Sequence, residues 1–179
     1  MNEDETTQAL SDKIMDRANV LRFGRPKSLQ AKGNPIQFGE KCGDRNPTTI
    51  KEWEKLQRKS LDAGDAEKLD KDIDNLNNVM ESLGRPFAHR VKRSIVNYVT
   101  NYPGVGSTVN SFNNALSDQI EFKILPKLNG IEKTNPDNSN HLNDLGNIIG
   151  SIDEELYKTF DNVLNDNSSS FFAWSGVRR

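Results

Sequence analysis

Residues 84–99, GRPFAHRVKRSIVNYV, carry the clearest helical pattern of the 179-residue chain. Apolar side chains recur there every four residues and share one helix face, namely Phe87, Val91, Ile95 and Val99. Basic side chains occupy the other directions at the front of this helix, namely Arg85, His89, Arg90, Lys92 and Arg93. Gly84 is typical of a helix stop, and Pro86 is typical of a first helical turn. The stretch therefore predicts an amphipathic helix that begins near Pro86.

Similar stripes lie on both sides of this stretch. Residues 66–83 predict a helix whose apolar face is formed by Leu69, Ile73, Leu76, Met80 and Leu83. Residues 112–128 predict another, with a spacing of four between Phe112, Leu116, Ile120, Ile124 and Leu128. Thr49 and Glu52 are spaced as a capping box before a shorter helix, and Ser151 and Glu154 repeat that spacing ahead of Leu156, Phe160, Val163 and Leu164. Residues 129–140 are polar and predict a loop.

Only residues 18–23, ANVLRF, indicate a strand. A strand needs a partner for its backbone groups, so an isolated one either pairs with a segment that shows no strand pattern or belongs to a sheet whose other strands lie outside this chain. We therefore expect a mainly α protein, a helical bundle preceded by one short strand. The expected divisions are an N-terminal segment with the strand at 1–25, a long loop or insertion at 26–47, the helical domain at 48–165 and a tail at 166–179.

The composition excludes several classes of protein. The 24 basic and 26 acidic residues give a formal charge of −2, which argues against a free-standing binder of duplex DNA. A single cysteine, Cys42, cannot form an intramolecular disulfide, and with His89 and His141 it is too few for a Cys/His zinc site. We expect no metal site. The start has no signal-peptide pattern, and no stretch has the length of a membrane span, so a cytoplasmic protein is expected.

No phosphate-binding loop of the G-x-x-x-x-G-K-[ST] type occurs in the sequence, so the chain by itself is not expected to hold a nucleoside triphosphate. The fragment GVGS at residues 104–107 has no following basic residue in register and is interpreted as a connector between helices. The acidic run from Asp62 to Asp74 is interpreted as a solvated helix surface.

Four segments, in this order, resemble the C-terminal part of McrB-like AAA+ NTPases, the motor subunits of modification-dependent restriction systems. Residues 2–23, NEDETTQALSDKIMDRANVLRF, resemble the stretch from sensor 1 through the arginine-finger helix to the last core strand. Residues 84–99 resemble the start of the helical lid, and residues 115–130, ALSDQIEFKILPKLNG, resemble a later lid helix. The ending FFAWSGVRR, residues 171–179, is similar to the aromatic ending of many members.

The resemblance implies roles for three residues. Asn2 would be the sensor-1 residue that orients the attacking water, and Arg17 would be the arginine finger that acts on a nucleotide bound by the next subunit. Arg90 would be the sensor-2 residue of the lid. The implied cofactor is ATP or GTP with Mg²⁺, bound only together with a P-loop-bearing core, and the isolated chain would bind none. The implied partners are that core, in a ring oligomer, a nuclease subunit and, indirectly, DNA in restriction or phage defence.

The chain departs from this family in two respects. Both Walker motifs and most of the parallel sheet are missing, so the chain is expected to be inactive alone. The resemblance implies that residues 1–25 are a remnant of the α/β core. In the pattern M-N-x-x-D-R of the McrB branch, Glu5 and Thr6 replace the final pair, so its guanine-nucleotide preference is not implied.

Two other functions are compatible with the sequence. The first is a free-standing all-α interaction module without enzymatic activity. The second is a helical domain that binds nucleic acid through residues 85–93.

Overall fold

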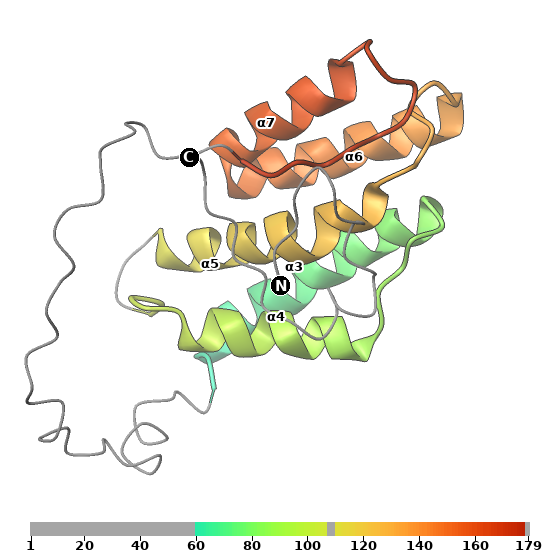
Figure 1. The fold of residues 1–179 in the computed structure, drawn as a ribbon. Coiled ribbons are helices and arrows are strands. Elements are labelled where there is room, and N and C mark those ends of the chain that lie inside the picture. The colour runs from blue at the N-terminus through green and yellow to red at the C-terminus, as the bar shows by residue number, and fades with distance from the viewer. Residues whose placement is uncertain (1–59, 107–109, 178–179) are drawn as a thin grey trace, which may run out of the picture.

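The computed structural model describes residues 60–106 and 110–177, and this part of the chain is mainly helical, as predicted (Figure 1). Its helices are α3 (Ala63–Ser82), α4 (His89–Asn101), α5 (Ser111–Gln119), the π-helical η2 (Ile120–Ile124), the 3₁₀ helix η3 (Leu125–Leu128), α6 (Pro136–Ile152) and α7 (Glu154–Asn165). No strand lies within these residues, where the one β-bridge joins Glu132 to Phe171. The predicted strand at 18–23, the loop at 26–47 and the capping box at Thr49 lie outside the described residues.

The α3 and α4 helices form a hairpin whose apolar stripes are buried, as predicted. The helix α3 begins three residues before the predicted start, because the Asp62 side chain accepts a hydrogen bond from the backbone of Asp65. At its end Gly84 has a φ of +69°, and the amides of Gly84 and Arg85 donate to the carbonyls of Glu81 and Met80, both at 2.8 Å. This is a Schellman ending, so the predicted stop at Gly84 is confirmed.

The predicted start of α4 at Pro86 is wrong. The helix begins at His89, and Pro86 lies in the extended connection before it. The backbone amide of Phe87 donates to Asn77 Oδ1 at 2.9 Å, which holds this residue outside the helix. The Phe87 side chain is nevertheless buried, so it adds to the apolar stripe from the connection.

The predicted helix at 112–128 is confirmed as one helical path whose hydrogen bonding changes along it, from α5 through η2 to η3. A spacing of four residues drifts around an α-helix of 3.6 residues per turn. The wider π turn of η2 offsets this drift, and Ile120, Ile124 and Leu128 all remain fully buried.

The helix α6 occupies part of the predicted loop at 129–140. It begins at Pro136, where the Asn135 side chain accepts the amide of Asp137 at 2.9 Å. It packs against α3, α5 and α7, and its buried residues include Leu142, Leu145 and Ile149. The polar first turn conceals this helix in the sequence, because Asn, Asp and Ser are equally typical of loops.

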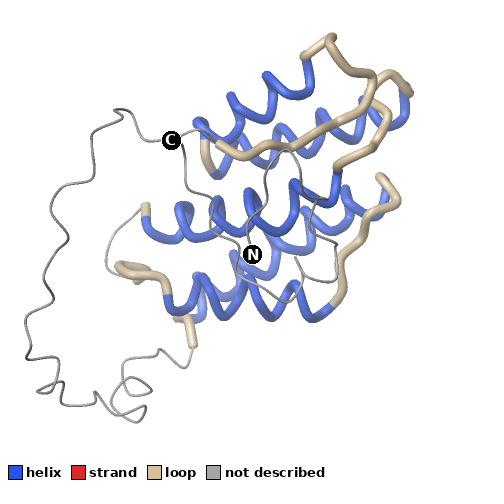
Figure 2. Tube along the Cα trace, in the orientation of Figure 1, coloured by secondary structure: helices blue, strands red, loops and turns tan. Residues whose placement is uncertain are grey.

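After α7 the chain turns back across α6 and α7 (Figures 1 and 2). We call residues 170–177 the C-terminal strap. The amide of Phe172 donates to the carbonyl of Ile131 at 2.8 Å, and the amide of Gly130 donates to the carbonyl of Phe172 at 2.9 Å. Phe172 lies 5.4 Å from Phe160 between ring centroids and stacks on Trp174. The strap therefore completes the core of the bundle.

Candidate functional site

The structure describes one of the three residues that the resemblance singles out. Arg90 lies in the first turn of α4 and is exposed. Asn2 and Arg17 lie outside the described residues.

Arg90 belongs to a basic surface on α4. Val91, Ile95 and Val99 of this helix are buried, whereas His89, Arg90 and Arg93 are exposed. Successive residues of a helix are rotated by about 100°, so Arg90 and Arg93 lie on the side opposite the buried stripe. Arg85, in the preceding turn, is also exposed. We call Arg85, His89, Arg90 and Arg93 the α4 basic face.

Lys92 differs from this basic face because it is neutralised by α3. Its ammonium lies 3.0 Å from Asp70 and 3.1 Å from Asp74, and hydrogen bonds to these two carboxylates raise its pKa. Within residues 60–106 and 110–177, no ion pair engages the four residues of the α4 basic face. The N-terminus of α4 adds a partial positive charge, since its first turn has no acidic residue and its N-cap, Ala88, has no capping side chain.

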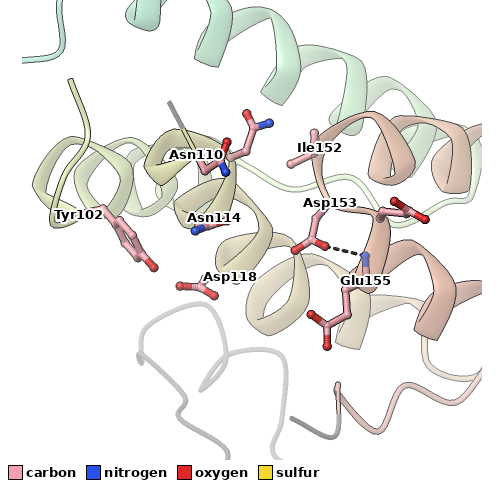
Figure 3. A pocket seen from close by; sticks show the side chains of 9 residues that line it. Tyr102, Asn110, Asn114, Asp118, Ile152, Asp153 and Glu155 are labelled. Carbon is pink, nitrogen blue, oxygen red and sulfur yellow. Dashed lines mark hydrogen bonds between the residues drawn. The ribbon is translucent and has the colours of Figure 1, made fainter. Parts of the chain in front are cut away.

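A second, acidic feature lies near the other end of α4. A cavity of about 690 Å³ is bordered by the end of α4, by α5 and by the junction of α6 and α7 (Figure 3). Its walls are polar and include Tyr102, Asn110, Asn114, Asp118, Asp153 and Glu155. Such a surface favours cations and hydrogen-bond donors. Among the described residues, however, no group of three or more His, Cys, Asp or Glu side chains is placed to hold a metal ion.

Two of the cavity's carboxylates have structural contacts. The Tyr98 hydroxyl donates to Asp118 Oδ2 at 2.9 Å, and burial, followed by this hydrogen bond, raises the pKa of Tyr98. The buried Ser117 hydroxyl donates to Asp153 Oδ2 at 2.5 Å, and Asp153 Oδ1 accepts the amides of Glu155 and Leu156. Asp153 therefore caps α7 and ties it to α5.

Sequence reasoning missed Asp153 because it assigned the cap to the wrong residue. The predicted capping box of Ser151 and Glu154 is wrong, since the Ser151 hydroxyl donates to the carbonyl of Ile148 within α6. The available signal was an aspartate at 153 followed by two glutamates, a common pattern at a helix N-terminus.

Replacing Asp153 by alanine is expected to lower the free energy of unfolding by about 2–3 kcal/mol. The cap contributes about 1 kcal/mol, and a buried Ser117 hydroxyl left without its acceptor costs a further 1–3 kcal/mol, partly offset by relaxation. Urea denaturation followed by circular dichroism measures this loss. Asp153→Asn is the control, because asparagine is also a good N-cap and retains an acceptor. Equal losses in the two variants would contradict the assigned role.

Comparison with known families gives a match over most of the helical bundle. The model of a family described as a domain of unknown function (DUF8727) matches residues 44–168. No curated protein and no solved structure matches the chain. None of the helices within the described residues is both long enough and apolar enough to cross a membrane.

Proposed function

This chain belongs to the DUF8727 family, whose model describes a domain of unknown function. For this family member we propose, from the resemblance of its segments, that it is the C-terminal portion of an McrB-like AAA+ NTPase. In this proposal it supplies the arginine finger, Arg17, and the sensor-2 residue of the lid, Arg90. Hydrolysis of ATP or GTP would drive DNA restriction or phage defence in the cytoplasm, together with a P-loop-bearing core in a ring.

The observation that carries the proposal is the position of Arg90. It lies at the front of α4, within the segment that resembles the start of a lid, and its side chain is exposed. Within the described part of the chain no carboxylate pairs with it. A guanidinium in this state is available to a phosphate that another chain segment holds.

The extent of the family match also supports the proposal. The match begins at residue 44, after the segment that resembles sensor 1 and the arginine finger, and ends at residue 168. The match thus covers the helices assigned to the lid and leaves out the segment assigned to the core, as expected if the lid is a separate domain. In this arrangement Arg17 would stabilise charge that develops on the nucleotide of the neighbouring subunit, while Arg90 would couple the lid to nucleotide binding.

Replacing Arg90 by alanine is expected to weaken nucleotide binding or hydrolysis by roughly tenfold to a hundredfold, which is the loss expected for one charge-assisted hydrogen bond. The assay measures ATP and GTP hydrolysis by the chain combined with the P-loop-bearing core, which the proposal places in the same gene or an adjacent gene. Lys158→Ala is the control, because it removes an exposed cation that pairs only with Glu154 on α7 in the described structure. Equal activity of the Arg90 and Lys158 variants would contradict the sensor-2 role.

The second candidate is a free-standing interaction module. It is favoured by the core of the described residues, which joins every helix and the C-terminal strap in one apolar cluster. This function predicts that deletion of residues 1–43 leaves partner binding unchanged. The NTPase proposal predicts that the same deletion removes stimulation of hydrolysis, because Arg17 is lost.

A further inference from the structure

The α4 basic face concentrates positive charge that no carboxylate among residues 60–106 and 110–177 pairs with. The helix neighbours of Arg93, three and four residues away, are His89, Arg90, Val96 and Asn97, and none of them is acidic. Like charges at these spacings destabilise a helix, and a surface helix commonly places carboxylates there instead. Helix α4 itself therefore supplies no carboxylate at these spacings to pair with Arg93.

The neighbouring helix α3 does not supply a carboxylate to Arg90 or Arg93 either. Asp70 and Asp74 of α3 engage Lys92, which lies on the side of α4 that faces them. Arg90 and Arg93 lie on the side of α4 opposite its buried stripe and are exposed. Because the whole chain has a formal charge of −2, this cluster is a local feature and does not reflect a general basic excess.

We propose that Arg93 is a second polyphosphate-binding residue that acts beside Arg90, with a nucleoside triphosphate as the ligand. The inference rests on the proposed function and extends it to a residue that the family resemblance does not single out. Arg90 and Arg93 are three residues apart on one helix face, so their guanidinium groups can contact neighbouring phosphate groups of one triphosphate. Two guanidinium groups also bind a compact polyanion more tightly than one does.

The charge distribution favours a compact ligand over a nucleic-acid backbone. The α4 basic face covers only the connection after α3 and the first turns of α4. Beyond Lys92 the adjoining surface of α3 is acidic, with Asp70 and Asp74 both largely exposed. A nucleic-acid backbone that extended from the α4 basic face towards α3 would be repelled by these carboxylates. A triphosphate is short enough to contact the basic face alone.

The test uses the full chain and inorganic tripolyphosphate as the probe, with binding followed by ¹⁵N-NMR titration at low salt. We expect weak binding that shifts the amides of residues 89–94 and weakens with added salt. Arg93→Gln should weaken it about fivefold or more, as should Arg90→Gln, while Lys158→Gln should bind like the original chain. Each variant's spectrum also shows whether it is folded.

Three results would overturn the inference. The first is equal affinity of the Arg93→Gln and Lys158→Gln variants. The second is a titration in which tripolyphosphate shifts only the amide signals of residues outside α4. The third is a higher affinity of the α4 basic face for duplex DNA than for tripolyphosphate at equal phosphate concentration. That result would assign the face to nucleic-acid binding.

The inference and the proposed function can fail separately. If Arg93→Gln leaves tripolyphosphate binding unchanged while Arg17→Ala still suppresses hydrolysis, only the inference fails. If tripolyphosphate binds as expected but the chain stimulates no P-loop-bearing partner, the proposed function fails and the anion-binding role of Arg93 stands.

Discussion

Replacing Arg17 by alanine is expected to lower NTP hydrolysis by about 10³–10⁵-fold when the chain is combined with its P-loop-bearing partner. An arginine finger contributes this much because its guanidinium meets negative charge that develops only as the phosphoryl group is transferred. In the proposed ring Arg17 acts from the neighbouring subunit on the transition state, so nucleotide affinity should change little. Steady-state hydrolysis and equilibrium nucleotide binding, measured on the same preparation, separate the two effects.

The matched control for this variant is Arg17→Lys. Lysine keeps the positive charge but lacks the planar, bidentate guanidinium, so hydrolysis should be restored only in part. If alanine at position 17 reduced nucleotide binding and hydrolysis equally, Arg17 would act in nucleotide binding and would not be a finger. If neither quantity changed, Arg17 would be an ordinary surface residue.

Replacing Phe172 by alanine is expected to lower the free energy of unfolding by about 3–5 kcal/mol, as for other large aromatic side chains in a core. Phe172 is 1% exposed and contacts the rings of Phe160 and Trp174. Its loss would leave a cavity where the C-terminal strap meets α7. Urea denaturation, followed by circular dichroism and by tryptophan fluorescence, measures the change.

Phe171 provides a matched control in the same segment. It has the same side chain one residue earlier, but it is 54% exposed. Phe171→Ala should therefore change the free energy of unfolding by less than about 1 kcal/mol. If the two variants were equally stable, the strap would not be part of the core.

The sequence predicted α3 well because its complete apolar stripe is followed by an explicit ending signal, and it predicted the buried stripe of α4 but not where that helix begins. At Gly84 the left-handed backbone needs glycine, so the stop could be predicted from one residue. Pro86 misled the prediction of the next start. Proline is as compatible with an extended connection as with a first helical turn, and the tertiary hydrogen bond from Phe87 to Asn77 decides between them.

Of the two candidate sites, one could be predicted from the sequence and the other could not. The α4 basic face could be predicted because its residues lie close together in the sequence at the start of one helix, and the structure adds that the neighbouring Lys92 is not part of it, since Lys92 pairs with α3. The acidic cavity could not be predicted, because it combines residues of α4, α5 and the α6–α7 junction. Its assembly depends on α6, whose polar first turn gave no helical signal.

The central claim is that this chain supplies the finger and lid of an AAA+ NTPase. Its most direct test measures ATP and GTP hydrolysis by the chain alone, by the P-loop-bearing core that the proposal requires, and by the two together. We expect negligible hydrolysis by the chain alone, strong stimulation in the mixture, and loss of that stimulation with Arg17→Ala. Hydrolysis by the isolated chain at ordinary enzyme rates, or a mixture no faster than the partner alone, would contradict the claim.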